Sequence, residues 1–277
     1  MTLAAARHWL SAILLTMLVF QPSSASAGMT PEEIRVFQGY KVMALKGDLV
    51  AQYNLGVCYD DGLGTEKDAV EAVKWWRKAA DQGDAQAQTD LGVCYANGAG
   101  VAKDAVEAVK WFRKAADQGE AGAQFNLGFA YFNGYGVAKN MVEAVKWYRK
   151  AADQGNVFAQ SDLGLCYVNG EGVAKDAVEA VKYFRKAADQ GLALAQYGLG
   201  LCYVAGEGVA KDQVEAYAYF NLAGITEELA RKNRDMLEKL MSPDTRIHGQ
   251  QRTKELQKEI DAKIAAKKAE DVKKSVK

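Results

Sequence analysis

A sequence of 16 residues recurs along this chain at a fixed interval of 36 residues. It runs Asp-Ala-Val-Glu-Ala-Val-Lys-Trp-Phe-Arg-Lys-Ala-Ala-Asp-Gln-Gly over residues 104–119. It returns almost unchanged from residues 68, 140 and 176, and in a more divergent form from residue 212. An internal period of about 20–50 residues is typical of solenoids, in which each repeat packs only on its neighbours. The chain is therefore expected to fold as a stack of repeated units.

The recurring stretch carries the signals of an amphipathic helix. Asp104 precedes Glu107 by three residues, the pattern of a capping box in which each carboxylate accepts from the backbone N–H of the other residue. Arg113 and Lys114 suit the negative end of the helix dipole. Gly119 supplies the left-handed residue that ends many helices. Apolar residues fall at helical spacing, at Ala105, Ala108, Val109, Phe112 and Ala115.

The other half of each unit predicts a second helix. In the second copy, Ala87, Leu91 and Tyr95 are spaced four residues apart and share one face. Gly92 costs helix stability, about 1 kcal/mol relative to Ala, yet recurs in all five copies, which indicates a close approach between two helices. The Asn-Gly-x-Gly-Val sequence at residues 97–101 then turns the chain into the next capped helix. Each unit is expected to be an antiparallel helix pair.

The recurring residues resemble the Sel-one-like repeat family. The pattern is Leu-Gly-x-x-Tyr-x-x-Gly-x-Gly-Val-x-x-Asp, followed by Ala-x-x-Trp/Tyr-Tyr/Phe-x-x-Ala-Ala-x-x-Gly. The resemblance implies an all-α fold, a right-handed tetratricopeptide-like α-solenoid of antiparallel helix pairs. It also implies a protein-interaction scaffold, because most members of the family act in this way. Many bacterial members are exported, and some take part in signalling or envelope processes.

The repeats and their flanks predict how the chain is divided. Residues 1–27 are expected to be a signal peptide and residues 28–48 a capping helix that begins after Thr30. Five repeats are expected at residues 49–84, 85–120, 121–156, 157–192 and 193–228, followed by two capping helices in 229–266 and a Lys-rich disordered tail in 267–277.

The first 27 residues have the composition of a secretory signal. Arg7 precedes an apolar run from Trp9 to Phe20, and Ala25-Ser26-Ala27 fits a cleavage site before Gly28. The alternative is an uncleaved anchor, but the run is shorter than the 20 or so residues that span a membrane. We expect a periplasmic or secreted protein, a monomer with no membrane span after cleavage.

Charge is distributed unevenly along the chain. Residues 228–277 hold 14 basic and 9 acidic residues, and residues 28–227 hold 20 basic and 26 acidic residues. The repeats are therefore acidic and the C-terminal segment is basic. A nucleic-acid-binding protein usually has a strongly basic face, so no nucleic-acid partner is expected.

Repeat-to-repeat variation marks the candidate binding residues. In the first helix of each pair, the second, fifth, ninth and twelfth positions vary, and their spacing places them on one face. The resemblance implies that this helix lines the concave side, where apolar and aromatic residues are typical of interaction sites. The alternative is that neighbouring helices bury part of this face. The candidate partner-binding residues are Tyr53, Asp60, Phe125, Phe129, Phe132, Phe158, Val168, Tyr197 and Val204.

The four cysteines occupy one position of the repeat. Equivalent positions in adjacent repeats lie about 9–10 Å apart, too far for a disulfide. Cysteine-rich exported relatives instead carry two cysteines per repeat, a pattern that this chain lacks. We therefore expect free, buried thiols and no metal cluster at Cys58, Cys94, Cys166 and Cys202.

Catalysis is not expected. After removal of the signal His248 is the only histidine, which excludes most histidine-based nucleophile triads and His-rich metal sites. The sequence predicts an exported interaction scaffold or regulator that binds a protein or peptide in the concave groove, with no cofactor. The alternative is an envelope enzyme or a protein that binds a cell-wall fragment or β-lactam, as some cysteine-rich relatives do. A third possibility is a regulator that masks a membrane sensor through the same groove.

Overall fold

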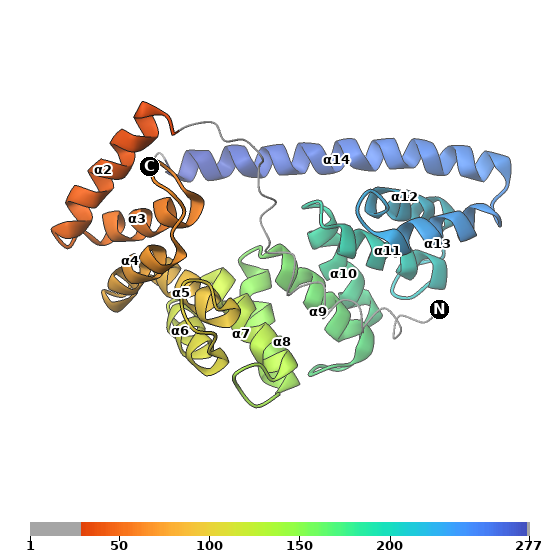
Figure 1. Cartoon of the computed structure of the whole chain (residues 1–277). Helices are drawn as coiled ribbons and strands as arrows, with labels where there is room; N and C mark the ends of the chain where they lie inside the picture. Colours follow the sequence, from red (N-terminus) through yellow and green to blue (C-terminus); the bar gives the residue numbers. More distant parts are fainter. Residues whose placement is uncertain (1–28, 276–277) are drawn as a thin grey trace. The chain divides into compact units, whose positions relative to one another are not determined.

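The computed structural model describes residues 29–275, and every regular element in this part of the chain is an α-helix (Figure 1). The predicted signal peptide, residues 1–27, lies outside the described residues. The helices are α2 (Pro31–Leu45), α3 (Leu49–Asp61), α4 (Ala69–Asp81), α5 (Ala85–Asn97), α6 (Ala105–Asp117), α7 (Ala121–Asn133), α8 (Met141–Asp153), α9 (Val157–Asn169), α10 (Ala177–Ala188), α11 (Ala193–Ala205), α12 (Gln213–Ala223), α13 (Glu228–Glu238) and α14 (Pro243–Ser275).

The helices belong to two compact units, one ending at Asn140 and the other beginning at Met141. We call the first helix of each predicted repeat the A helix and the second the B helix. Unit 1 contains the A helices α3, α5 and α7 and the B helices α2, α4 and α6. Unit 2 contains the B helices α8, α10 and α12, the A helices α9 and α11, and the terminal helices α13 and α14.

The caps of the B helices differ in part from the sequence prediction. The Asp104 carboxylate accepts from the backbone N–H groups of Val106 and Glu107 at 2.9 and 3.0 Å, as expected. The predicted second bond of the capping box, from the backbone N–H of Asp104 to the carboxylate of Glu107, is wrong. The backbone N–H of Asp104 donates instead to the carbonyl of Tyr95 at 2.9 Å. Glu107 instead pairs with Lys110 at 2.8 Å. The A helix α5 therefore accepts the hydrogen bond that the capping box would have directed to Glu107.

A complete capping box begins the first described helix. The Thr30 hydroxyl accepts from the N–H of Glu33 at 3.2 Å, and the Glu33 carboxylate accepts from the N–H of Thr30 at 2.8 Å. Pro31 occupies the first helical position, where its missing N–H costs nothing. The predicted start of this helix after Thr30 is confirmed.

Glycine ends the B helices as predicted. Gly119 is left-handed, with φ 95°, and its N–H donates to the carbonyl of Ala116 at 3.0 Å. The N–H of Glu120 donates to the carbonyl of Ala115 at 3.1 Å. These two bonds form a Schellman motif, which satisfies the carbonyls at the end of α6.

The predicted close approach at the A-helix glycine is confirmed. A methyl group at Gly92 would lie 2.6 Å from the ring of Phe112, which packs on α5 from its partner helix α6. Trp76 has the same relation to Gly56 in the preceding repeat. The absence of a side chain allows an aromatic ring to lie directly on the helix backbone, which offsets the helix propensity lost at glycine.

Polar groups also join consecutive repeats. Gln88 is buried on α5, and its side-chain amide donates to the carbonyl of Ala80 at the end of α4. Its side-chain carbonyl accepts from Gln118 at the end of α6 at 2.8 Å. In addition, Arg113 of α6 donates to the hydroxyl of Tyr131 of α7 at 2.6 Å. Buried polar groups need such partners, so these bonds favour one register of stacking.

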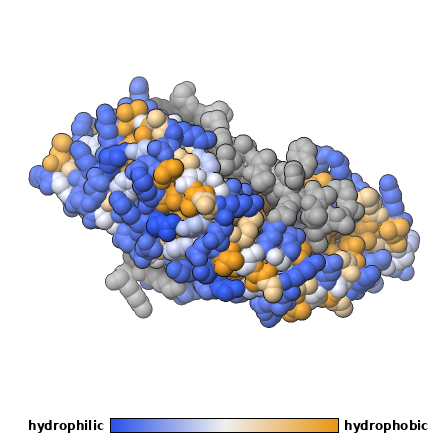
Figure 2. Space-filling view, turned by 90° about the horizontal axis from the view of Figure 1, so that it is seen from below, coloured by the Kyte–Doolittle hydropathy of each residue, from blue (hydrophilic) through white to orange (hydrophobic). Residues whose placement is uncertain are grey.

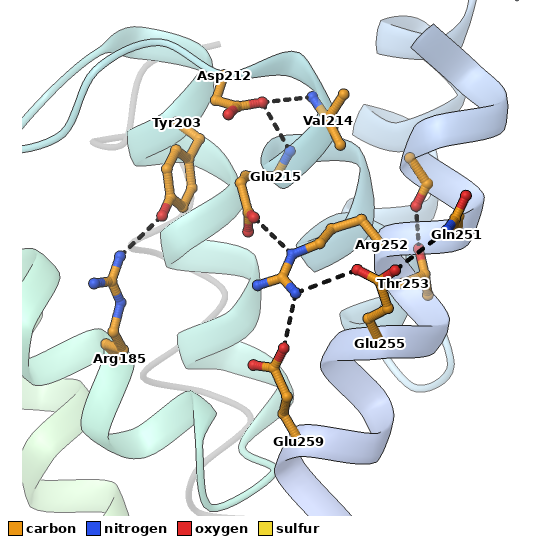
Figure 3. A network of polar contacts seen from close by, with 11 residues as sticks. Arg185, Tyr203, Asp212, Val214, Glu215, Gln251, Arg252, Thr253, Glu255 and Glu259 are labelled. Carbon is orange, nitrogen blue, oxygen red and sulfur yellow. Dashed lines mark hydrogen bonds and ion pairs between the residues drawn. The ribbon is translucent and has the colours of Figure 1, made fainter. Parts of the chain in front are cut away.

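The last repeat is covered by α14. Leu256 and Ile260 are buried on this helix, and Gly249 lies against Tyr217 of α12. Arg252 bridges to Glu215 of α12 at 2.7 Å and to Glu259 of its own helix at 2.8 Å (Figure 3). The arginine thus ties α14 to the repeat on which it packs.

The C-terminal helix extends further than the sequence predicted. It was expected to end at residue 266, with a disordered segment from 267, but α14 continues to Ser275. Residues 265–275 contain no Gly or Pro and are rich in Ala, Lys, Glu and Asp, so little in the sequence opposes continuation of a helix. Lys263 and Lys267 also contact Asp189 and Gln190 of unit 2 at 2.8 and 2.5 Å.

Candidate functional site

The candidate surface in unit 1 is built by the three A helices α3, α5 and α7. We call the surface formed by their second, fifth, sixth, ninth and twelfth residues the A-helix face of unit 1. Neighbouring helices are joined there by side chains. Tyr53 of α3 donates to the carboxylate of Asp90 on α5, and Thr89 of α5 donates to Glu120 at 3.1 Å. Glu120 is itself the N-cap of α7.

Acidic groups gather on this face. The pKa of Asp90 is raised to about 6, chiefly by burial and to a smaller extent by the charges of Glu120 and Asp60, while hydrogen bonds from Gln86 and Tyr53 oppose the rise. The pKa of Asp60 is also raised, first by desolvation and then by the adjacent Asp61. Like charges that raise one another's pKa values lie close together, so the face carries a concentrated negative potential at neutral pH.

Aromatic residues of α7 extend the same face. Phe125 and Phe129 are both half-buried, with their ring centroids 6.5 Å apart and their planes tilted by 41°. Phe132 lies on the same side and is also half-buried. Five predicted site residues therefore lie on the A-helix face of unit 1, namely Tyr53 and Asp60 on α3 and Phe125, Phe129 and Phe132 on α7.

Tyr135, at the tip of the loop after α7, is a packed residue. Its hydroxyl donates to the carbonyl of Ala96 at the end of α5 at 2.6 Å, and Lys103 lies over its ring at 5.8 Å. The loop of one repeat thus covers the twelfth position of the A helix before it.

The predicted site residues of unit 2 have different environments. Phe158 and Val204 are 44% and 45% exposed. Val168 is only 5% exposed and belongs to the core, so its assignment to a binding surface is corrected. Val168 and Val204 occupy the same repeat position, but only Val168 is succeeded by a further repeat. In the third repeat the loop residue Tyr135 bonds to this position of the preceding repeat, Ala96, so a succeeding repeat can contact it.

Tyr197 is the second correction in unit 2. Its hydroxyl accepts from Asn233 of α13 at 3.0 Å, and its ring lies 5.8 Å from that of Phe220. It also packs against the cluster that contains Leu237. The helix α13 therefore covers the part of the fifth A helix that the sequence assigned to partner binding.

A carboxyl group in unit 2 has the most perturbed acidic pKa in the described residues. Tyr148 of α8 is fully buried and donates to Asp162 of α9. Burial raises the pKa of Asp162 to about 7, and the bond from Tyr148 opposes the rise. Tyr148 stands where other B helices carry the ring that packs on glycine. The residues at this position of α4, α6, α8, α10 and α12 are Trp76, Phe112, Tyr148, Phe184 and Phe220. The single tyrosine among them could have been noticed in the sequence.

Sequence reasoning also missed Asp90 and Glu120. Asp90 occupies the sixth position of the A helix, which holds Asn or Asp in the first four repeats and Gly in the fifth. That position was not counted among the variable ones. Glu120 was treated only as the end of a repeat, although the corresponding residues of other repeats are Asp84, Asn156 and Leu192.

The four cysteines are free and buried, as predicted. Burial raises the pKa of Cys94 to about 12 and that of Cys202 to about 11. A thiol with a raised pKa is a poor nucleophile at neutral pH. Within residues 29–275 no three His, Cys, Asp or Glu side chains are placed to share a metal ion, and no helix there is both long and apolar enough to cross a membrane.

The comparison with family models identifies the repeats. The Sel1 repeat model matches residues 49–84, 85–120, 121–156, 157–192 and 193–224. The chain belongs to the Sel1 repeat family. The fold is thus an all-α solenoid of Sel1 repeats, and proteins of this family are generally non-catalytic interaction scaffolds.

Two solved structures show the same fold. A Sel1 repeat protein from Oxalobacter formigenes is 38% identical, with a TM-score of 0.63, and the match covers 71% of this chain and 85% of that protein. The protein c5321, a protective antigen of uropathogenic Escherichia coli with an SLR fold, is 30% identical with a TM-score of 0.58. That match covers 86% of this chain but 59% of c5321. No curated protein matches this Sel1 repeat chain.

The surface of this Sel1 repeat protein has no continuous apolar band in the view of Figure 2. Hydrophobic residues gather in separate patches among hydrophilic ones. Scattered apolar residues of this kind are normal on the surface of a soluble protein and do not by themselves mark a binding site.

Proposed function

We propose that this Sel1 repeat protein is an interaction scaffold, and that the A-helix face of unit 1 binds a protein or peptide segment. The main support is the combination of an aromatic pair, Phe125 and Phe129, with the acidic groups Asp60, Asp90 and Glu120 on adjoining A helices. Aromatic side chains supply anchoring area at low entropic cost. The acidic groups around them select the charge of the partner.

The chemistry of this face favours a basic segment. The negative potential attracts Lys and Arg side chains and repels acidic ones. The phenylalanines lie on α7 and the carboxylates of Asp60 and Asp90 lie on α3 and α5, so an apolar residue of the partner would contact the rings while a cation elsewhere in the same segment contacts the carboxylates. A segment that alternates basic and apolar residues would meet both requirements.

A pull-down tests this proposal. The protein and its Phe125→Ser/Phe132→Ser variant are used as bait in envelope extract, after circular dichroism shows that the two melt alike. We expect a partner that the unchanged protein retains and the variant loses. A second variant, Asp60→Asn, should weaken capture at low salt and have less effect at high salt, because salt screens exposed charges. A partner retained equally by all three proteins would exclude this face as the binding site.

We also propose that the protein is exported and processed after Ala27. The support is the sequence of residues 1–27, an Arg-containing start, an apolar run and an Ala-Ser-Ala end. Expression in a bacterial host and then cell fractionation should place the protein in the periplasm or medium, with Gly28 as its first residue by N-terminal sequencing. A cytoplasmic protein that retains its first residues would contradict the proposal. Replacing Ala25 and Ala27 by bulky residues should prevent the cut.

A further inference from the structure

The first described helix is a B helix without an A helix of its own. Aligned by the 36-residue period, Val36 and Met43 of α2 correspond to Ala72 and Ala79 of α4. Both alanines are fully buried, since they lie on the side of α4 that packs against its own A helix, α3. In α2 this side has no such partner among residues 29–275. Val36 is 43% exposed and Met43 is 49% exposed.

The same end of the stack is more apolar than the corresponding surface of the other repeats. Val42 is 54% exposed, and it stands where four other B helices carry lysine, at Lys78, Lys114, Lys150 and Lys186. Solenoids generally need a polar outer face on their terminal repeats to remain soluble. Val42 therefore enlarges the apolar surface that Val36 and Met43 expose at this end of the stack.

Gly39 lies in the centre of this surface. A methyl group there would have no described atom within 4 Å, whereas the corresponding residue of α4 is the buried Trp75. A glycine inside a helix costs about 1 kcal/mol relative to alanine. No contact among residues 29–275 explains that cost, since the space beside Gly39 is open to them. A close approach by a helix from another molecule would explain it, as small residues do where two helix backbones meet.

We propose that α2 packs against α2 of a second copy of this chain, antiparallel to it, with a twofold axis at Gly39. We call the contacting surface the end face. It consists of the residues that share the exposed side of α2 at helical spacing, namely Glu32, Arg35, Val36, Gly39, Val42, Met43 and Lys46, and within it Arg35 pairs with Glu32 at 2.8 Å.

The spacing of the end face is symmetric about Gly39. Val36 and Val42 are each three residues from Gly39, so each valine meets the other valine of the second copy. Arg35 and Met43 are each four residues from Gly39, so the methylene groups of Arg35 lie against Met43 of the second copy. Glu32 and Lys46 are each seven residues from Gly39, so the Glu32 carboxylate, which pairs with Arg35 of its own helix, also meets the ammonium group of the second copy. A self-complementary surface of this kind is what a closed twofold dimer requires. The opposite charges at the two ends of α2 also favour the antiparallel pair over a parallel one.

The occupant is therefore a second copy rather than an unrelated helix. A heterologous partner would need an acidic residue opposite Lys46 and a basic one opposite Glu32, and α2 itself supplies both at the right distances. A single helix pair is a small interface, so association should be reversible and dependent on protein concentration. This dimer does not depend on the proposed function, because the A-helix face of unit 1 is built by other helices.

Sedimentation equilibrium of the purified full chain at several concentrations tests the dimer. The unchanged protein should show a monomer–dimer equilibrium. The Val36→Glu/Val42→Glu variant should have a dimer dissociation constant that is higher by roughly tenfold or more, because the two buried carboxylates of each copy then face the two of the other copy. The matched control is Val106→Glu/Val178→Glu, at valines of B helices that are 55% and 53% exposed. The control should leave the equilibrium unchanged. A protein that is monomeric at every concentration, or a control that dissociates equally, would overturn the proposal.

Charge reversal tests the antiparallel arrangement without adding buried charge. Glu32→Lys and Lys46→Glu should each weaken the dimer, and the double variant should restore it, since the pair is then reversed on both copies. Gly39→Cys should form an intermolecular disulfide on mild oxidation, because the two residues meet at the axis and the native cysteines are buried. Failure of the double variant to restore association, or a dimer with no Gly39→Cys cross-link, would contradict an axis at Gly39.

Discussion

Gly100→Ala is expected to destabilise the repeat stack by about 3 kcal/mol or more, through a left-handed backbone and a steric clash together. Gly100 has φ 67°, and a methyl group there would lie 2.0 Å from the carbonyl oxygen of Ala69. That oxygen belongs to the first residue of α4, so the loop after α5 lies directly on the preceding B helix. Thermal unfolding measured by circular dichroism should show a large fall in the midpoint.

The matched control for this change is Gly119→Ala. Gly119 is also left-handed, with φ 95°, but a methyl group there would have no described atom within 4 Å. Its replacement should therefore cost only the left-handed penalty, about 1–2 kcal/mol. The difference between the two variants isolates the clash. Equal losses in the two variants would show that Gly100 is needed only for its backbone conformation.

The second glycine of the Gly-x-Gly loop thus positions neighbouring repeats. Gly136 and Gly208 have the same relation to Ala105 and Ala177 that Gly100 has to Ala69. Each loop is held against the B helix of the repeat before it. This contact requires a bare backbone at the second glycine.

Asp162→Asn is expected to make the protein more stable than the unchanged chain above pH 7. The pKa of Asp162 is raised to about 7 in the folded protein, from an ordinary value near 4 in the unfolded chain. The unfolded state therefore loses its proton first, and stability falls as the pH rises from about 4 through 7. Asn keeps an acceptor for Tyr148 and removes the charge. The gain at pH 8 should be roughly 1–3 kcal/mol, allowing for partial solvent contact.

Urea unfolding of both proteins between pH 5 and pH 8.5 tests this prediction. The two stability curves should converge towards low pH, separate as the pH rises to about 7, and run parallel above pH 7, where Asp162 is ionised in both the folded and the unfolded protein. Asp235→Asn is a suitable control, because that carboxylate lies on α13 and more than half of its side chain is exposed. It should shift stability little at any pH. If the curves of the unchanged protein and Asp162→Asn stay parallel over the whole range from pH 5 to pH 8.5, Asp162 is ionised with an ordinary pKa in the folded protein.

Much of the fold was predictable because each element depends on local signals. Asp104, Gly92 and Gly119 recur at fixed positions in the repeats, and each has the physical role that its type suggested. Repetition made these signals reliable, since a chance pattern would not recur every 36 residues. The free cysteines could be predicted from the same register, because residues at one repeat position are separated by the spacing of packed helices.

The binding surface was less predictable because it depends on neighbouring repeats. Val168 and Tyr197 were assigned from their repeat positions, but Val168 is buried in the core and Tyr197 is bonded to Asn233 of α13. The bond from Tyr53 to Asp90 joins residues 37 apart, and only the stacking of α3 on α5 brings them together. Sequence position identifies a face, whereas the adjoining helices decide which of its residues remain available.

Site-specific photo-cross-linking from Phe129 is the most direct test of the proposed binding face. A photoreactive phenylalanine analogue is placed at Phe129, and the same analogue at Val106 on α6 is the control, since Val106 lies on an exposed side of a B helix. Irradiation in cells should yield a cross-linked protein from Phe129 but not from Val106. The cross-linked partner should carry basic residues next to the attachment point. Cross-linking from Val106 alone, or an acidic segment at Phe129, would contradict the account.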